Sequence, residues 1–394
     1  MKIIFLISQI PYPPDTGAKI RSFNLIRRLA ERHEITLVTY ADKNRELSKI
    51  EALRKYCKKV IVVRRSGKPA LYTLFTNIFS VFPYTIDKYY SKDMERRISE
   101  LIKDGKYDLV HCDSLQMSLN LRSAANVPLV LTEHNVESQI LERCVLNEKN
   151  FLKKTYIKLQ TQKLSDYEIS ACRSFNRCIT VSETDRFYLA DNSGIDTISV
   201  VPNGVDCEYF RPQNARIKPY RLVFTGSLDW LPNEDALVYF FNDIYPALKR
   251  KVPGLNITVV GRNPSQKLLR IAEREPRIHI TGSVNDVRPY IAESEIFIVP
   301  LRIGGGTRLK ILEAMAMGKP VISTSIGAEG LDVEDGRNIL LADMPEDFNR
   351  HIIELFQNNE KRSKLAKAGR KLVEEKYDWS KIAKELERAW RKVA

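Results

Sequence analysis

The sequence predicts an α/β protein of two domains, each a doubly wound, Rossmann-like parallel sheet covered by helices. Three observations predict this class. Short apolar runs alternate with helical segments along both halves of the chain, as is typical of βαβ units. A run of turn-forming residues at 199–219 interrupts the alternation near the middle. The length of 394 residues is sufficient for two separate hydrophobic cores.

The first half opens with a βαβ unit. Residues 3–7 form an apolar run, residues 21–32 a helical pattern and residues 34–40 a second apolar run. The Pro-rich turn that ends at Gly17 follows the first strand, where open α/β sheets bind ligands. It is not G-x-G-x-x-G, so a dinucleotide site is not supported. Further strands are expected at 60–63, 109–111, 128–132 and 177–181.

Two stretches of the first half do not fit a simple strand or helix pattern. Residues 70–90 are dense in aromatic side chains and follow Arg64, Arg65 and Lys68. That combination suits a membrane interface or a lipid-linked acceptor, although helices packed on their own domain produce it more often. Residues 142–176 form a long, lysine-rich helical pattern, for which we expect a solvated face.

The alternation of strands and helices restarts after the turn-rich stretch. We therefore divide the chain into an N-terminal domain at 1–198, a linker at 199–219, a C-terminal domain at 220–375 and a C-terminal helix at 376–394. That last helix could cross back to the N-terminal domain. Strands are expected at 221–226, 256–261, 278–282, 296–300, 320–324 and 338–341, with helices at 235–252, 265–273 and 287–292.

The most informative stretch is residues 300–322, which reads as a strand end, a triple-glycine turn and an apolar helix. Glycines before a helix let the backbone approach a ligand, and the helix N-terminus favours an anion such as a diphosphate. Arg308 and Lys310 lie in the first turn, where a bound polyphosphate would compensate their charge. Glu313 is the only acid of this helix, so it either pairs with Lys310 or binds a ligand.

The net charge and the composition restrict the classes of binding partner and the cellular location that we expect. The net charge of +14 favours an anionic partner, and a membrane surface with a phosphorylated ligand fits better than nucleic acid because the basic residues are scattered. No apolar run reaches the length of a membrane span, so we expect a cytoplasmic protein that could be peripheral on the inner membrane face. The six cysteines are scattered, which favours free thiols over disulfides or zinc.

Several short sequence motifs occur in a characteristic order along the chain. They are Asp15-Thr16-Gly17 with Arg21 and Asn24, and the segments 108–111, 132–135, 181–183, 201–206, 224–228, 259–261, 300–322 and 377–379. In this order they resemble the retaining glycosyltransferases of the two-Rossmann-domain (GT-B) architecture, in particular the family 4 (group 1) sugar transferases of surface-polysaccharide pathways. The resemblance covers nearly the whole chain.

The resemblance implies a metal-independent transferase of the hexosyltransferase type that uses a nucleotide-diphosphate sugar, UDP or GDP, as donor and has no other cofactor. The acceptor would be a glycan or a lipid-linked molecule. The sequence has no Asp-x-Asp motif, so cationic side chains and helix ends would stabilise the leaving diphosphate. Glu313 would bind the ribose hydroxyls, Gly17 would line the donor phosphates and His134 would lie at the reacting sugar.

The residues that the resemblance implies fall into three groups. The catalytic group is His134, Arg308 and Lys310. The donor-binding group is Gly17, Gly226, Ser227, Gly261, Gly304, Gly305, Gly306, Thr307, Glu313 and Ala314. The acceptor-side group is Asp15, Arg21, His111, Asp113, Asn135 and Glu137, although a core role is equally open for His111.

Two departures from the family pattern bear on function. Relatives commonly carry an acid eight residues before the ribose glutamate, whereas this chain has Gly305. Many also have Gly-Arg-Leu followed by a lysine, whereas this chain has Gly-Ser-Leu at 226–228, and Arg308 and Lys310 are the substitutes we expect. Two alternatives therefore stay open, a nucleotide-sugar epimerase of the same fold and a catalytically silent nucleotide-sugar-binding protein.

Overall fold

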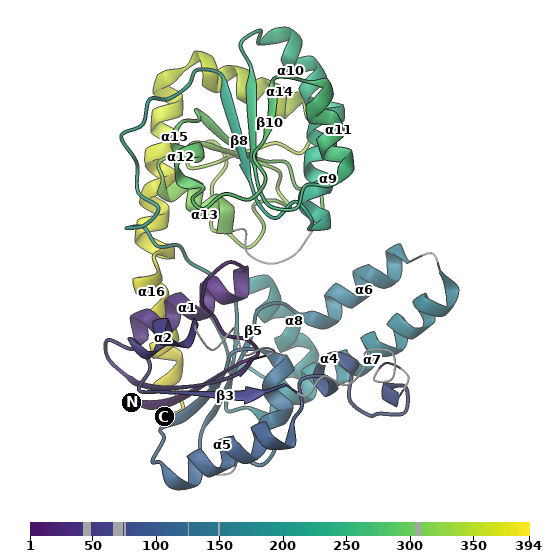
Figure 1. Cartoon of the computed structure of the whole chain (residues 1–394), viewed down its shortest axis with the longest axis vertical. Coiled ribbons are helices and arrows are strands. Elements are labelled where there is room, and N and C mark those ends of the chain that lie inside the picture. The colour runs from purple at the N-terminus through teal and green to yellow at the C-terminus, as the bar shows by residue number, and fades with distance from the viewer. Residues whose placement is uncertain (42–48, 66–73, 75, 125, 149, 304–308) are drawn as a thin grey trace. The chain divides into compact units, whose positions relative to one another are not determined.

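The computed structural model describes residues 1–41, 49–65, 74, 76–124, 126–148, 150–303 and 309–394 (Figure 1). The chain forms two compact units. The first contains Met1–Pro202 together with Ile382–Ala394, and the second contains Asn203–Lys381. Each unit is a parallel β-sheet between helices, as the sequence predicts.

The first unit is organised around a sheet of seven parallel strands among the described residues, in the order β3-β2-β1-β4-β5-β6-β7. The central strands β1 and β4 are almost entirely buried because helices cover both faces of the sheet. Their register pairs Ile3 with Leu109 and Phe5 with His111. The strands are β1 (Lys2–Ile7), β2 (Glu34–Ala41), β3 (Lys59–Arg64), β4 (Leu109–Cys112), β5 (Leu129–Glu133), β6 (Arg177–Thr180) and β7 (Ile198–Val200).

Local capping explains several helix boundaries of the first unit. Ser91, Asn150 and Ser182 each accept a backbone N–H from the first turn of the following helix. Gly194 ends one helix in the left-handed conformation, at a φ of 69°. The helices are α1 (Gly17–Leu29), α2 (Ile50–Arg54), α4 (Tyr84–Asp87), α5 (Lys92–Asp104), the 3-10 helix η2 (Leu115–Leu121), α6 (Glu137–Asn147), α7 (Phe151–Ser174) and α8 (Glu183–Ser193).

The prediction of one continuous helix at 142–176 is wrong. The structure has two helices there, α6 and α7, which form a hairpin (Figure 1). Asn150 accounts for the break, because its side chain accepts the N–H of Lys153 and so starts a new helix. The solvated face that we expect applies to the first part of α7, whereas its later part buries Leu164, Glu168 and Cys172.

The second unit repeats the plan with six parallel strands among the described residues, in the order β10-β9-β8-β11-β12-β13. The strands are β8 (Arg221–Thr225), β9 (Asn256–Val260), β10 (Ile278–Ile280), β11 (Ile296–Val299), β12 (Val321–Ser323) and β13 (Leu340–Leu341). The helices are α9 (Leu231–Tyr239), α10 (Tyr245–Lys251), α11 (Gln266–Arg274), α12 (Arg288–Ala292), α13 (Leu309–Ala316), α14 (Pro345–Gln357), α15 (Asn359–Leu372) and α16 (Trp379–Trp390), with π-helical turns η3 (Phe240–Ile244) and η4 (Val373–Tyr377).

The single helix predicted at 235–252 is interrupted. The π-helical turn η3 separates α9 from α10, and the N–H of Tyr245 bonds to the carbonyl of Phe240. Pro246 follows immediately and has no N–H to donate, so a regular α-helical ladder cannot run through this point.

The stretch 199–219, which the sequence predicts to be a linker, contains the point where the chain passes from the first unit to the second. Its first residues complete β7 and the first unit, and the change of unit falls between Pro202 and Asn203. Val205 then forms a parallel bridge with Asp378 inside the second unit.

Helix α16 begins in the second unit, and its residues from Ile382 onward belong to the first. Trp390, near its end, is completely buried and packs edge-on against Phe5 and His111. Among the described residues, no helix is both long and apolar enough to cross a bilayer.

Candidate functional site

The glycine-rich segment that the sequence singles out follows β11 and precedes α13 in the sequence. Gly304, Gly305, Gly306, Thr307 and Arg308 fall outside the residues that the structure describes. Helix α13 starts at Leu309 and carries the remaining members of the motif.

Glu313 is partly exposed on an otherwise buried helix, because Ile311, Leu312, Ala314 and Met315 all face the core of the second unit. Desolvation raises the pKa of the Glu313 carboxyl to about 7, and the positive charge of Lys310 opposes this rise without cancelling it. A polar ligand that donates hydrogen bonds to the ionised Glu313 carboxylate would offset the cost of its desolvation.

Lys310 points toward the loop after β8. Its Nζ donates to Oδ1 of Asn233 at 2.7 Å and lies 4.0 Å from the centre of the Phe224 ring. Asn233 is itself fixed, because its Nδ2 donates to the carbonyl of Ser227 at 2.8 Å. The Lys310 ammonium is therefore held at the turn that follows β8.

Gly226 and Gly261, which directly follow β8 and β9, form a tight backbone contact. The N–H of Gly226 donates to the carbonyl of Val260 at 3.0 Å. A Cβ at Gly261 would lie 1.8 Å from the carbonyl oxygen of Gly226, and a Cβ at Gly226 would lie 2.7 Å from Lys310 Nζ. Only glycine fits at these two positions without moving the Lys310 ammonium or the turn.

Beyond these glycines, polar side chains line the same edge of the second sheet. Ser227 Oγ donates to Asp229 Oδ1 at 2.6 Å and accepts from Nε of Arg262 at 2.9 Å. Asn263 donates to the other oxygen of Asp229 at 2.8 Å. Hydrogen bonds from Ser227 and Asn263 lower the pKa of Asp229. Arg262 thus adds a second cation near the turn that holds Lys310.

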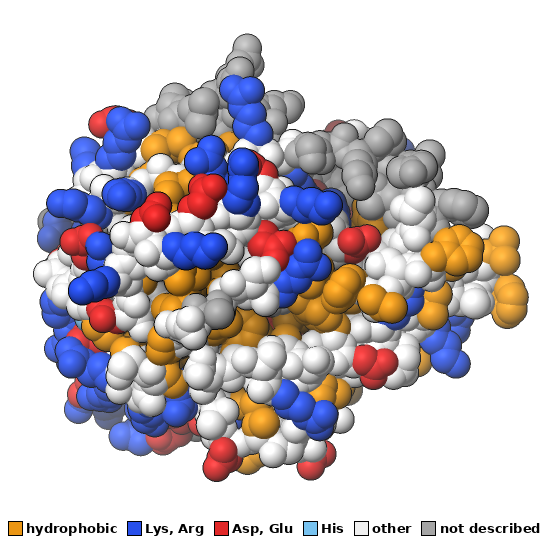
Figure 2. Space-filling view, turned by 90° about the horizontal axis from the view of Figure 1, so that it is seen from below, with side chains coloured by type: hydrophobic (Ala, Val, Ile, Leu, Met, Phe, Trp, Pro, Cys, Tyr) orange, Lys and Arg blue, Asp and Glu red, His pale blue; other side chains and the backbone are white. Residues whose placement is uncertain are grey.

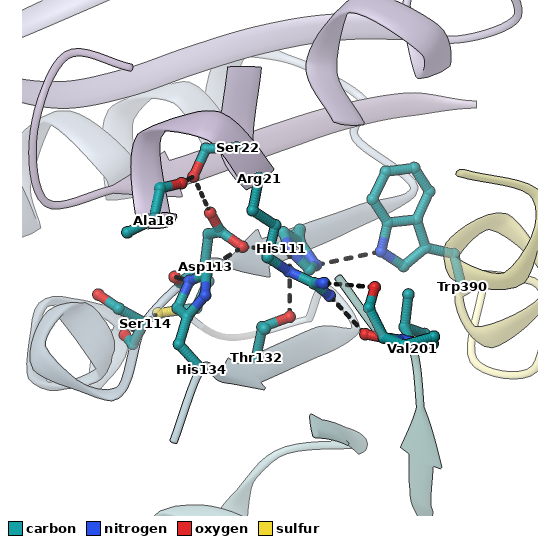
Figure 3. A network of polar contacts seen from close by, with 12 residues as sticks. Ala18, Arg21, Ser22, His111, Asp113, Ser114, Thr132, His134, Val201 and Trp390 are labelled. Carbon is teal, nitrogen blue, oxygen red and sulfur yellow. Dashed lines mark hydrogen bonds and ion pairs between the residues drawn. The ribbon is translucent and has the colours of Figure 1, made fainter. Parts of the chain in front are cut away.

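In the first unit, an acid, two histidines and a hydroxyl gather at the carboxyl ends of β4 and β5 (Figure 3). Asp113, just after β4, is buried, and its carboxylate accepts hydrogen bonds from Ser22 Oγ of α1 and, at 3.4 Å, from His111 Nε2. His134, just after β5, donates from Nε2 to the carbonyl oxygen of Asp113 at 2.6 Å. Asp113 therefore joins α1, β4 and the segment after β5.

The hydrogen-bond partners of His111 and His134 show which ring nitrogen of each carries a proton. A tryptophan N–H can only donate, so the 3.1 Å bond from Trp390 to Nδ1 of His111 leaves the proton of His111 on Nε2. Burial lowers the pKa of His111, which keeps its ring neutral. His134 also carries a proton on Nε2, because a carbonyl can only accept.

Asp113 supplies the negative charge of this network. Burial opposes its ionisation, but the interactions with His134 and His111 outweigh burial and hold the pKa of Asp113 well below its usual range. Arg21 is completely buried and donates to the carbonyls of Val201 at 2.9 Å and Pro202 at 2.8 Å. Desolvation lowers the pKa of Arg21 to about 10, and Asp113 opposes this shift.

Two family models match the chain. One is described as Glycosyltransferase Family 4 and matches residues 16–209, and the other is described as Glycosyl transferases group 1 and matches residues 219–358. The chain belongs to the family-4-like glycosyltransferases of group 1. The two matches together span both units, and they confirm the resemblance inferred from the motifs.

Curated relatives of this glycosyltransferase cover much of its length. An uncharacterised protein of the cps region of Klebsiella pneumoniae is 25% identical over 396 residues, which are 97% of each chain. The UDP-Gal:alpha-D-GlcNAc-diphosphoundecaprenol alpha-1,3-galactosyltransferase of Escherichia coli is 28% identical over 285 residues, which are 67% of each chain.

Solved structures confirm the GT-B fold of the glycosyltransferase. HepE of Anabaena, solved in complex with UDP, matches with a TM-score of 0.72 at 16% identity and covers 100% of both chains. The sucrose-phosphate synthase of Thermosynechococcus elongatus matches with a TM-score of 0.73 at 17% identity and covers 100% of this chain and 98% of its own.

The structure separates the residues predicted for the glycosyltransferase into two sets. The second unit gathers Gly226, Ser227, Gly261 and Lys310 at the carboxyl edge of its sheet. Glu313 follows Lys310 on α13 and is close enough for the charge of Lys310 to act on its carboxyl. Ala314 is buried in the core beside them, and its carbonyl accepts the N–H of Lys319. Sequence reasoning missed Asn233 and Arg262 here. Arg262 directly follows a predicted glycine, which is the one signal that could have found it.

Three residues of the predicted acceptor-side group are buried within the first unit, and their roles toward an acceptor stay predictions. Arg21 and His111 are completely buried in the first unit, Arg21 against the carbonyl of Val201 and His111 against the indole N–H of Trp390. The Arg21 guanidinium donates hydrogen bonds to the carbonyls of both residues 201 and 202. Asp113 is also buried, at the centre of the histidine network.

The other predicted residues of the first unit lie nearer the surface. Gly17 is exposed at the start of α1, and Asp15 pairs with Lys19 at 2.9 Å. Asn135 is half-buried after His134. The backbone N–H of Glu137 donates to Glu168 at 2.8 Å. Their roles toward an acceptor stay predictions.

Proposed function

We propose that this glycosyltransferase transfers a hexosyl group from a nucleotide-diphosphate sugar, with UDP as the favoured carrier, to a glycan or lipid-linked acceptor in glycoconjugate synthesis. The transfer retains anomeric configuration and needs no metal ion. The observation that carries the proposal is the placement of the Lys310 ammonium beside the Gly226 turn, with the partly exposed Glu313 carboxyl within reach of its charge on the same helix.

Glu313 suits the ribose of the donor. Vicinal hydroxyls can both donate to one carboxylate, and such bonds to an ionised acceptor are stronger than bonds between neutral groups. Donor binding would therefore favour the ionised form of Glu313, whose pKa lies at about 7 in the free protein. The buried neighbours of Glu313 exclude water from one side of the contact.

Lys310 suits the diphosphate. Its ammonium is held by Asn233 at 2.7 Å at the edge of the Gly226 turn, so the charge is positioned before the donor arrives. Charge builds on the leaving diphosphate during transfer, and a fixed cation stabilises that charge. Arg262 and Arg308 would add positive charge, which supports leaving-group stabilisation by side chains in place of a metal ion.

In the first unit, His134 is the group proposed to act at the reacting sugar. It is partly exposed, with 17% of its side chain accessible, whereas Asp113 and His111 behind it are buried. The bond from His134 Nε2 to the carbonyl of Asp113 orients the ring and leaves Nδ1 to accept a hydrogen bond. Retention would follow from front-face transfer assisted by the leaving phosphate, as the family resemblance implies.

The relatives support the donor and acceptor classes. The Escherichia coli relative is named for a UDP-sugar and a lipid diphosphate acceptor, and UDP is present in the HepE structure. Both family models describe transferases, which favours transfer over the alternative of epimerisation.

The test uses the purified full chain and a panel of UDP-, GDP-, ADP- and TDP-sugars. Thermal shifts report binding, and nucleotide release in the presence of a lipid diphosphate or glycan acceptor reports transfer. We expect stabilisation by UDP-sugars, with Glu313→Gln and Lys310→Met each lowering turnover by about 100-fold. Glu329→Gln and Lys251→Met are matched exposed controls in the same unit.

Each contrary result points to a different function. Full turnover by both variants would remove Glu313 and Lys310 from the donor site. An isomerised free sugar formed without acceptor would favour the epimerase, and donor binding without turnover across the acceptor panel would favour a silent binding protein.

A further inference from the structure

The first unit displays an unusual set of apolar side chains at one end. Among the described residues, the five most exposed large apolar side chains all lie there. Phe79 and Val81 are 81% and 82% exposed, and Leu146, Phe151 and Leu152 are each 78% exposed. Single exposed apolar residues are common, but a group with this exposure marks an interaction surface.

We propose that the apolar tip, defined as Val81, Leu146, Phe151 and Leu152, docks the protein on an anionic lipid bilayer. These residues come from the loop before α4 and from the two helix ends that meet in the α6–α7 hairpin. In Figure 1 the hairpin reaches outward from the sheet of the first unit. Figure 2 shows apolar side chains gathered at one edge of the view, with Lys and Arg side chains beside them.

The loop that carries Val81 is firmly built on α7. Lys163 Nζ donates to the carbonyls of Asn77 and Ile78, each at 3.0 Å, and of Ser80 at 2.6 Å. The buried Asn77 side chain accepts from Gln160 Nε2 of the same helix at 3.0 Å. After Val81, the N–H of Tyr84 donates to Oε1 of Gln160 at 2.8 Å. Because α7 fixes the backbone on either side, the outward position of Val81 is a product of the fold.

The aromatic stretch at 70–90 divides between the core and the surface. Ile86 is buried, and Phe82 packs edge-on against Tyr167 of α7, with ring centres 6.0 Å apart. Val81, next to Phe82, faces outward instead. Packing on the domain and display of an apolar surface are therefore both present in the part of this stretch that the structure describes.

The hairpin adds apolar residues at its turn. Leu146 lies in the last turn of α6, and Phe151 and Leu152 open α7 directly after the Asn150 cap. Leu159 is seven residues after Leu152, on the same face of α7, and is 40% exposed. The apolar surface thus continues along the helix from the turn.

Charge decides which partner this surface fits. Residues 140–163 contain six basic and two acidic side chains, which gives the hairpin a strong positive balance. Lys154 and Lys158 are exposed and, within the described ranges, have no carboxylate at ion-pair distance. Apolar side chains flanked by unneutralised lysines are the pattern that binds the interface of an anionic bilayer. Two copies of the same basic tip would repel each other, which disfavours self-association.

Flotation of the full chain with vesicles tests the proposal. Vesicles of phosphatidylcholine with phosphatidylglycerol are compared with phosphatidylcholine alone, at low and high salt. We expect binding to the anionic vesicles only, weakened by salt. Phe151→Ser with Leu152→Ser, and separately Lys154→Glu with Lys158→Glu, should each reduce the bound fraction about tenfold. Val81→Ser should reduce it less.

Matched controls separate the tip from general surface effects. Met344→Ser removes an exposed apolar side chain of the second unit, and Lys267→Glu with Arg270→Glu reverses two exposed charges on α11. Both should float like the unchanged protein. Far-UV circular dichroism and thermal unfolding check the fold, and the lysine pair keeps the test valid if a serine variant unfolds.

Three outcomes would overturn the proposal. The first is flotation that neither the apolar nor the lysine changes reduce. The second is equal binding to neutral and anionic vesicles at both salt concentrations. The third is a dimer, detected by light scattering without lipid, that becomes a monomer in Phe151→Ser with Leu152→Ser while vesicle binding is absent throughout, because the occupant would then be a second copy of the chain.

Discussion

Trp390 donates its indole N–H to Nδ1 of His111 at 3.1 Å, which joins the C-terminal helix to β4 across 279 positions of sequence. His111 in turn contacts Asp113, and Asp113 contacts His134. The end of the chain therefore orients, through two buried residues, the histidine proposed to act at the sugar.

Replacing Trp390 by phenylalanine tests this relay. The ring packing against Phe5 is largely kept, but Nδ1 of the buried His111 loses its donor, which costs about 1–3 kcal/mol. We expect a lower free energy of unfolding in urea and a lower kcat with little change in the KM for donor. Trp379→Phe, the same change at the other end of α16, is the control. A normal kcat in Trp390→Phe would show that the relay does not support catalysis.

Donor binding should depend on pH through Glu313. Its pKa is raised to about 7, so the stronger, ionised acceptor is a minor form below that pH and the main form above it. Donor affinity should therefore rise about tenfold from about pH 6 to about pH 8. Calorimetric titration with UDP measures this, and Glu313→Gln should bind weakly with a flat profile. An unchanged slope in that variant would assign the titration to another group.

The close approach of Gly226 and Gly261 predicts a sharp effect of one methyl group. In Gly261→Ala the new Cβ would lie 1.8 Å from the Gly226 carbonyl oxygen, so the turn that holds Lys310 must move. We expect a loss of about 2–4 kcal/mol in stability and of the thermal shift caused by UDP. Gly336→Ala is the comparison, since its φ of 74° is strained while its Cβ meets no atom within 4 Å. Equal losses in both variants would contradict the contact.

Glu168 predicts how stability changes with pH. Burial raises its pKa to about 7, although Ser138 and the N–H of Glu137 donate to it, and the pKa of the buried Glu133 is raised well above its usual range by burial and by Glu168. A buried acid whose pKa is raised stabilises the folded protein in its protonated form. The free energy of unfolding should therefore fall as the pH rises from the pKa of Glu168 in the unfolded chain, near 4.5, through its pKa in the folded protein, about 7.

Urea unfolding across this pH range should show a loss of up to about 3 kcal/mol from Glu168 alone. In Glu168→Gln the loss should shrink and the stability at pH 8 should increase. Asp166→Asn, an exposed acid two residues earlier on α7, should behave like the unchanged protein. Parallel curves for all three proteins would rule out Glu168 as the titrating group.

Much of the fold could be predicted because its strands are local patterns. The central strands are short apolar runs, so their extents differ from prediction by a residue or two. The breaks inside predicted helices were missed because each depends on a single residue within a helical pattern, Asn150 in one case and Pro246 in the other.

By itself, the sequence determined the class of this protein, two βα-repeating domains with a glycine turn and Glu313 on the helix after it. Those features are read from spacing alone, since glycine conformation and helix periodicity are local properties. The tertiary structure decided which side chains form hydrogen bonds with each other. Asn233 lies 77 positions from Lys310, and Trp390 lies 279 from His111, so only folding could bring each pair within a hydrogen bond. The tertiary structure also decided which side chains are exposed: Arg21 is buried, whereas Phe151 is exposed to solvent. Burial depends on what packs against a residue in space and not on its neighbours in the sequence.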